Sequence, residues 1–399
     1  MVLAVNSYNS GDPQPAAVGL DSTGAILWGI RVGQNVVYLH GVATNAAGTV
    51  FLVGEDMARK VWLASYTPGA VVWNWAVEIT PSGANGQPAT SCTAYSIRYP
   101  ASDLIAITGG GAAGNGPTAT FVAMVAASTG ALVWGETYWD NNGEIGPLNS
   151  ITGTDAGFVL AVGEHLNPSR GMAAAFSWYG GLLGIKYYSS NALLDGNGVV
   201  ALADVTPWVS TTGIVVGSED TLGGLGTTTG VLFGIIDSMT LEFAIAGEFD
   251  FPGYGACSGS RITSGSLRNN FALIGNLTGD AYDPPAFILG AGANQGHAFC
   301  ASTLARGLTT LTPGGGNPER TGGLLASKFA AFGSNVFTAG WDGDPGECAS
   351  PLQYSSAQRT LTSRALHPLI FPVTEVVAAG APALFVPPPG VDCAVGEAC

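Results

Sequence analysis

The chain has 399 residues, a formal net charge of −15 and only three lysines, Lys60, Lys186 and Lys328. Because it lacks a basic footprint, it is not expected to bind nucleic acid, and apolar stretches such as 157–164 are too short to cross a membrane. With 47% hydrophobic and 10% charged residues the chain can bury a large core, and its 59 glycines favour short strands joined by tight turns.

A strand-forming phrase that ends in glycine recurs along the whole chain. Its copies end at Gly54, Gly109, Gly163, Gly217, Gly275 and Gly340, and "VLAVN", ending at Asn6, occupies the same slot. Glycine and asparagine both tolerate left-handed backbone angles, which accounts for the exchange. Successive copies end 48 to 65 residues apart. Seven copies at this spacing predict seven repeated structural units.

Each copy has the same surroundings. One strand precedes the phrase, as in 38–44, and another follows it, as in 120–128. A fourth strand comes next, and its sequence is nearly identical in "STGAILWGI" (22–30) and "STGALVWGE" (128–136). Four short strands per unit of roughly fifty residues are typical of a propeller blade. The sequence therefore predicts an all-β, seven-bladed β-propeller of four-stranded antiparallel blades.

Two predictions concern the start of the fourth strand. Its turn glycine supplies the positive φ that a hairpin needs, and its tryptophan packs between adjacent blades. The glycines are Gly24, Gly69 and Gly130, and the tryptophans are Trp28, Trp73 and Trp134.

One domain, residues 1–382, is expected to hold all the blades. They are centred near 1–33, 36–80, 92–139, 147–190, 199–250, 258–303 and 322–368. The first lacks an inner strand, so we expect 375–382 to supply it, which would close the ring with both termini and remove exposed sheet edges. Residues 383–399 contain three consecutive prolines and read as an extended tail, either free or docked on a neighbouring subunit.

The segments 20–28, 43–56 and 121–138 resemble the repeats of seven-bladed SBBP-type propellers and, more loosely, PQQ-enzyme-like repeats. The resemblance covers about residues 1–370, fades in the last copies, and implies a fold rather than an activity.

Two acidic, glycine-rich loops are candidate Ca²⁺ sites. Asp140, Asn142 and Glu144 form one partial ligand set, and Asp342 and Asp344 form another. Calcium needs six or more oxygen ligands, and plain turn chemistry explains the same residues. Apart from this candidate calcium, no cofactor is expected.

Six cysteines without a CxxC pair argue against a zinc site. They are either buried free thiols or disulfides, and Cys393 with Cys399 is the favoured pair. Asn276 opens the sequon "NLT", a candidate glycosylation site.

No catalytic motif is apparent. Four histidines show no paired metal-ligand spacing, and Asp204 and Glu319 stand as isolated carboxylates without a visible partner. Two carboxylates with a His or Tyr at one mouth of the central channel would favour an enzyme.

Three functions remain open. The favoured one is a non-enzymatic subunit of an exposed assembly, such as a virion, tail, surface filament or coat, that binds neighbouring proteins or a surface glycan. Since the first residues lack a basic, apolar leader, we expect an extracellular or virion-surface location reached without one. The alternatives are a secreted SBBP-like binding protein whose signal was removed and a hydrolase or lyase acting at the channel face.

Overall fold

The protein is built from β-strands. The computed structural model describes residues 2–9, 12–20, 26–33, 35–70, 72–83, 86–101, 103–112, 119–140, 145–166, 169–190, 198–220, 229–251, 257–264, 270–277, 286–292, 298–300, 308–311, 323–328, 336–341, 355–373 and 375–378. Within these ranges there is no helix, and all strand pairings are antiparallel. The all-β prediction is confirmed.

The N-terminal half of the chain forms strands that pair with their neighbours in sequence. One sheet holds β1 (Val2–Asn9), β2 (Asp12–Leu20) and β3 (Ile26–Arg31). The next holds β4 (Val36–Thr44), β5 (Val50–Asp56), β6 (Val61–Tyr66) and β7 (Trp75–Thr80). A third holds β8 (Ser91–Ala101), β9 (Leu104–Ala112), β10 (Ala119–Ala126) and β11 (Leu132–Trp139).

The same pattern continues in a longer sheet. It contains β12 (Ile145–Gly153), β13 (Phe158–Leu166), β14 (Ser169–Ser177), β15 (Leu182–Ser190), β16 (Gly198–Pro207), β17 (Thr212–Asp220), β18 (Thr229–Asp237) and β19 (Phe243–Asp250). Among the described residues, two pairs, Ser189 with Val199 and Ser190 with Gly198, join β15 to β16. The sheet is therefore two sequential groups of four strands that touch at one corner.

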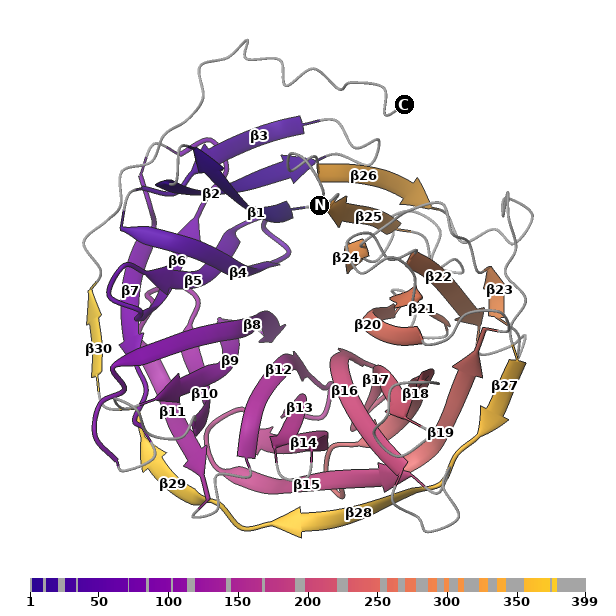
Figure 1. Ribbon diagram of the computed structural model, residues 1–399. Helices are drawn as coiled ribbons and strands as arrows, with labels where there is room; N and C mark the ends of the chain where they lie inside the picture. The colour runs from indigo at the N-terminus through magenta and orange to yellow at the C-terminus, as the bar shows by residue number, and fades with distance from the viewer. Residues whose placement is uncertain are drawn as a thin grey trace.

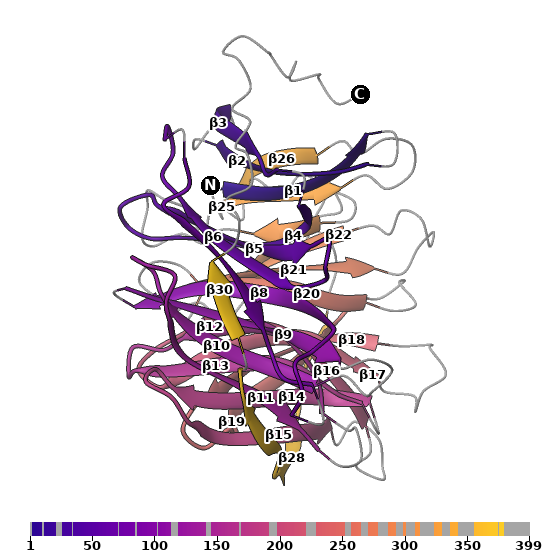
Figure 2. The same ribbon diagram turned by 90° about the vertical axis from the view of Figure 1, so that its left-hand side faces the viewer.

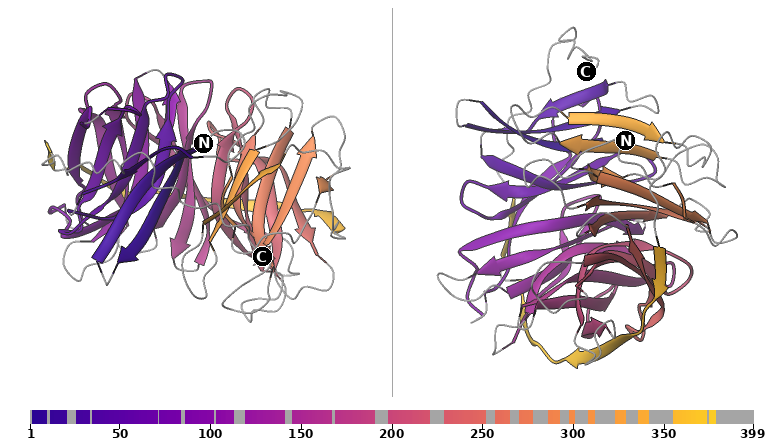
Figure 3. Two further views of the ribbon diagram at one scale, coloured as in Figure 1. Left: turned by 90° about the horizontal axis from the view of Figure 1, so that it is seen from above. Right: turned by 45° about the vertical axis from the view of Figure 1, so that its right-hand side comes forward.

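Two further sheets follow in chain order. The first holds β20 (Cys257–Ser264), β21 (Asn270–Leu277), β22 (Ala286–Gly292) and β23 (Ala298–Cys300), and the second holds β24 (Leu308–Leu311), β25 (Gly323–Lys328) and β26 (Val336–Trp341). The sheets stand around a common centre, with β4, β8, β12, β16 and β20 on the inside (Figure 1). Seen from above, the strands run between the two faces of the ring (Figure 3). This radial arrangement is a β-propeller.

The last strands run back around the outside of the ring. β27 (Ser355–Gln358) pairs with β19, β28 (Leu361–Leu366) with β15, β29 (Leu369–Pro372) with β11, and β30 (Glu375–Ala378) with β7. We call residues 355–378 the C-terminal belt; it is the yellow segment on the rim in Figures 1 and 2. The belt covers four outer edges in the reverse of chain order.

The pairing of the belt strands shows that two predictions were wrong. Residues 375–378 do not supply an inner strand to the first blade, because they pair with the outer strand β7. β27 and β28, expected inside a seventh blade at 322–368, lie on β19 and β15 instead. The unpaired backbone groups of those outer edges provide the physical reason, since an extended segment nearby satisfies them.

The apolar cores lie between consecutive sheets, and the belt closes them from outside. Val373 packs against the core shared by β4–β7 and β8–β11. Leu366 packs against the next core along the ring, and Leu361 against the one after it. One belt residue therefore seals the rim of each of three successive cores.

Tryptophans also connect neighbouring sheets. Trp134 Nε1 donates a hydrogen bond to Trp178 O at 2.8 Å, as its predicted packing between units implies. In the preceding sheet the equivalent bond, to Ala127 O at 2.8 Å, comes from Trp75 rather than Trp73. Trp73 instead packs beside Trp62 and Tyr66 in the core between the sheets of β1–β3 and β4–β7. Trp28, from the first of these sheets, packs against the same core.

Candidate functional site at the ring centre

The recurring glycine shapes the inside of the ring. A Cβ on Gly54, Gly109, Gly163 or Gly217 would lie 1.8 to 2.1 Å from a carbonyl oxygen of the neighbouring inner strand. None of these four has a positive φ, so the left-handed angle is not what selects glycine there. Positive φ is instead found at the turn glycines Gly69 (89°) and Gly130 (75°), as predicted.

The close approach marks a β-bulge in each inner strand. Opposite the glycine, the pairing register skips one residue: His40 in β4, Tyr95 in β8, Asn149 in β12 and Ala203 in β16. Bulges of this kind redirect a side chain out of the ladder. Each skipped residue is more exposed than the buried residue before it. The bulges thus present one side chain from each of the four inner strands at the centre of the ring.

Two of these side chains share a carboxylate. Glu55, at the end of β5, lies 3.7 Å from His40 (Nε2 to Oε2) and accepts a 3.1 Å hydrogen bond from Thr93 Oγ1 of β8. Tyr95 is 37% exposed, and its hydroxyl interacts electrostatically with Glu55 and with Glu164 from β13. We call His40, Glu55, Thr93, Tyr95 and Glu164 the axial cluster.

Burial and charge set the protonation of the axial cluster. Burial lowers the pKa of His40, although Glu55 opposes that shift. Burial, followed by Glu55 and Glu164, raises the pKa of Tyr95. These shifts favour a neutral His40 imidazole and an un-ionised Tyr95 hydroxyl, both of which can form hydrogen bonds with a hydroxyl-bearing ligand or transfer protons.

Asp204 is not the isolated carboxylate that the sequence suggested. It is 1% exposed and accepts hydrogen bonds from Ser150 Oγ of β12 and from Ile262 N of β20, the latter at 3.0 Å. Arg98 of β8 lies 3.7 Å away (Nη2 to Oδ1). Four inner strands thus meet at one buried carboxylate, whose oxygens are occupied by structural contacts. Glu319 lies outside the described residues.

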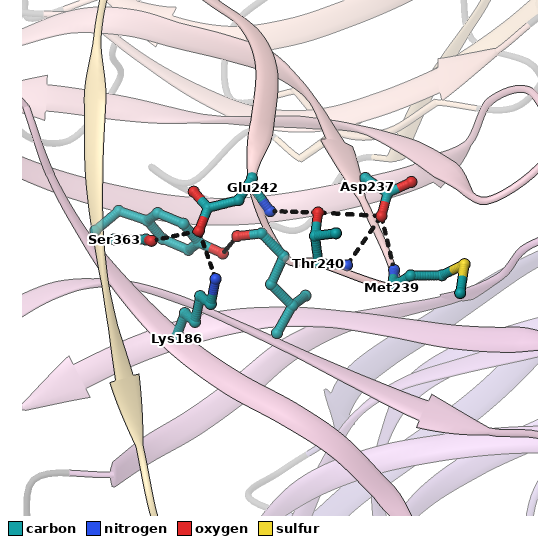
Figure 4. A network of polar contacts seen from close by, with 8 residues as sticks. Lys186, Asp237, Met239, Thr240, Glu242 and Ser363 are labelled. Atoms are coloured by element: carbon teal, nitrogen blue, oxygen red, sulfur yellow. Dashed lines mark hydrogen bonds and ion pairs between the residues drawn. The ribbon is translucent and has the colours of Figure 1, made fainter.

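A second polar network lies on the rim. Lys186 of β15 and Ser363 of the belt both contact Glu242 Oε1, at 2.5 and 2.8 Å, and these bonds lower the pKa of Glu242 (Figure 4). Asp237 caps the turn before β19 through Met239 N and Thr240 N. This network fastens the belt to two neighbouring strand groups.

Most sequence-predicted site residues lie elsewhere. Asp140 follows β11 directly, while Asn142, Glu144, Asp342, Asp344, Cys393 and Cys399 are outside the described residues. The calcium sites and the disulfide therefore stay predictions, as does glycosylation of Asn276, whose backbone lies in β21.

Cys92 is a free, buried thiol that donates to Arg59 O, and burial raises its pKa to about 11. Across the described ranges, no three His, Cys, Asp or Glu side chains are grouped to hold a metal ion. Nor does that part of the chain include a helix long and apolar enough to span a membrane.

No protein-family model and no curated protein matches the sequence. Similar solved structures include a protein from Lactobacillus plantarum, at 11% identity and a TM-score of 0.46, with 92% of this chain and 98% of that chain covered. A quinohemoprotein alcohol dehydrogenase from Pseudomonas putida is 11% identical with a TM-score of 0.44. That match covers 83% of this chain but only 61% of the dehydrogenase chain. Likeness at this level carries no argument about activity.

Proposed function

We propose that the protein is a non-enzymatic, seven-bladed β-propeller that serves as a structural or recognition subunit of an exposed assembly, such as a virion, tail or surface filament. The strand groups β1–β3, β4–β7, β8–β11, β12–β15, β16–β19, β20–β23 and β24–β26 support seven blades. Its partners are neighbouring proteins or a surface glycan, and its location is extracellular or on a particle surface.

A row of exposed apolar side chains carries this proposal. Leu27, Val72, Val133 and Leu183 occupy the same repeat position, at or just before the start of the outermost strand, and all are exposed. Tyr179 (81% exposed) and Met239 lie in the turns that precede β15 and β19, at the same ends of those strands. We call these six residues the apolar rim. Exposed apolar residues gathered at one face mark surfaces that bind proteins.

Tyr179→Ser combined with Leu183→Asn is expected to reduce incorporation into the native assembly at least tenfold, because both large apolar groups would leave the rim. The measurement is quantitative mass spectrometry of purified particles, with unfolding midpoints recorded for each variant. Met57→Asn is the matched control, since Met57 is 72% exposed in the turn between β5 and β6, at the opposite ends of the strands. Recovery of the unmodified chain only as a free monomer would refute the proposal.

The axial cluster favours a second candidate, a hydrolase or lyase acting at the channel face. It combines two glutamates with a histidine and a tyrosine, residue types that act as general acids and bases. To test this candidate, the protein is incubated with neutral and acidic polysaccharides, and the mixtures are analysed for new reducing ends and for unsaturated products. Tyr95→Phe is expected to cut any turnover at least tenfold, whereas Asn149→Ala retains it. Absence of product from the unmodified chain removes this candidate.

A further inference from the structure

Four side chains lie in a row across one face of the β12–β15 strand group. His165 of β13 is paired with Arg170 of β14, and Tyr187 of β15 is paired with Arg364 of the belt. The Tyr187 ring stacks on His165 at 4.4 Å between centroids, and Arg170 Cζ lies 5.7 Å from the same centroid. Arg364 Nη1 donates a 3.1 Å hydrogen bond to the Tyr187 hydroxyl. We call these four residues the guanidinium cluster.

Neither arginine of the guanidinium cluster is neutralised within the part of the chain that the structure describes. No carboxylate there lies within ion-pair distance of Arg170 or Arg364, and the buried Nε of Arg170 donates no hydrogen bond. Carboxylates are not scarce, because acidic residues outnumber Lys and Arg by 28 to 13 in the sequence. A partly buried cation without a counter-charge is unfavourable, and a bound anion would remove that cost.

The next strand group shows what the same positions hold when the charge is balanced within the chain. Glu219 lies two residues after its recurring glycine, as His165 does. Glu248, on the outermost strand β19, occupies the position that Tyr187 has on β15. Both glutamates contact Arg359 of the belt. In the β12–β15 group an imidazole and a phenol replace these carboxylates, so a counter-charge has to come from outside these strands.

We propose that the guanidinium cluster binds the carboxylate of an acidic glycan, such as a uronate-containing polysaccharide. Guanidinium groups bind carboxylates through paired, charge-assisted hydrogen bonds. The ring and the hydroxyl of Tyr187 can contact the apolar face and the hydroxyls of the same sugar. Arg364 is exposed, and Arg170 and Tyr187 are half-buried, so all three are accessible from solvent.

The location of the cluster favours a glycan over a second protein. Arg170 and Tyr187 lie toward the end of the β14–β15 hairpin that is away from its turn. Tyr179 in that turn and Leu183 beside it belong to the apolar rim, the surface that we propose for protein partners. The two surfaces are therefore at opposite ends of the same strands. The inference specifies the surface glycan of the proposed function, and for the source of the carboxylate it rests on that function.

Isothermal titration calorimetry of the purified full chain with a short oligogalacturonate tests this proposal. The methyl ester of the same oligosaccharide keeps the sugar but removes the charge, so it is expected to bind at least tenfold more weakly. Arg170→Gln and Arg364→Met should each weaken binding of the acid at least tenfold. Arg31→Gln, which removes an exposed arginine from β3, is the control and should leave the affinity unchanged. Equal affinity for acid and ester, or binding of neither, overturns the proposal.

A second set of titrations separates the source of the carboxylate and the fold from the site. Arg364 is exposed, so Arg364→Met carries the test if Arg170→Gln fails to fold. A polyglutamate peptide that binds as tightly as the oligogalacturonate would assign the site to an acidic protein segment and overturn the glycan proposal. The double substitution Tyr179→Ser and Leu183→Asn should leave oligogalacturonate binding unchanged.

The failure of this site and the failure of the proposed function give different results. A chain that binds the oligogalacturonate but is recovered only as a free monomer would refute the assembly function and leave the site supported. A chain that enters particles but binds neither acid nor ester would refute the site alone.

Discussion

Arg359→Met is expected to destabilise the protein by about 3–5 kcal/mol, the usual result of removing one partner from a buried ion pair. The Arg359 guanidinium, held by the belt, donates to Glu219 Oε2 at 2.6 Å and also contacts Glu248 Oε2. Glu219 is fully buried, at 0% exposure, and Glu248 is nearly so. Removal of the cation would leave two buried carboxylates without their positively charged partner. Urea unfolding measured by tryptophan fluorescence gives the change in free energy.

The destabilisation is expected to depend on pH with a defined sign. Burial raises the pKa of Glu219 above its ordinary value, and Arg359 opposes that shift. Without Arg359 the folded protein binds a proton on Glu219 more tightly than the unfolded chain does, so its stability rises as pH falls toward the ordinary glutamate pKa. The deficit of Arg359→Met therefore shrinks between pH 7 and pH 5.

Two controls separate this effect from a general loss of the belt. Arg364→Met should change stability by less than about 0.5 kcal/mol, because Arg364 is exposed and its contact among the described residues is a 3.1 Å hydrogen bond to the Tyr187 hydroxyl. Adding Glu219→Gln and Glu248→Gln to Arg359→Met should recover much of the loss. An Arg359 variant as stable as the Arg364 variant at pH 7 would contradict the buried-pair account.

Gly217→Ala is expected to cost about 3 kcal/mol, the upper end of the usual overpacking range. A Cβ at this position would lie 1.8 Å from the carbonyl oxygen of Ala201, a backbone atom that cannot turn aside. Relief requires moving the bulged inner strand β16, which also carries Asp204. Unfolding by urea provides the measurement, and near-ultraviolet circular dichroism reports whether the inner strands keep their packing.

Gly29→Ala is the matched control for this substitution. Gly29 also lies in a strand, and a Cβ there would meet nothing within 4 Å. Its stability should stay within about 0.5 kcal/mol of the unmodified protein. Equal losses at Gly217 and Gly29 would show that strand propensity, rather than contact with the inner strand, selects glycine in the recurring phrase.

The repeat phrase predicted the strands well because alternation and turn glycines are local signals. Gly69 and Gly130 have the positive φ expected of them. The reason for the glycine at Gly54 or Gly217 was not predictable in the same way, since it depends on a carbonyl of another strand. The belt strands were recognised as strands, but their partners were wrong, because a period of two says nothing about which edge a strand will join.

The axial cluster was missed for a related reason. His40 and Tyr95 are 55 residues apart and share no motif. Their common feature is position: each follows the buried residue that faces the recurring glycine, as in "LHG" (39–41) and "AYS" (94–96). Aligning the inner strands on that glycine would have found them. The contacts of Asp204 with Ser150 and Ile262, more than fifty residues away on either side, left no local signal.

The belt also has a consequence for how the protein is made. Its anchoring bonds join residues 140 and 290 positions apart, as in Arg359 with Glu219 and Ser82 Oγ with Pro372 O. During synthesis the N-terminal sheets emerge first, so the four outer edges wait for a segment that follows all of them in the chain. A nascent or prematurely terminated chain that stops before residue 355 keeps those edges open to other chains. Synthesis of the belt therefore ends the period in which these four edges are open to other chains.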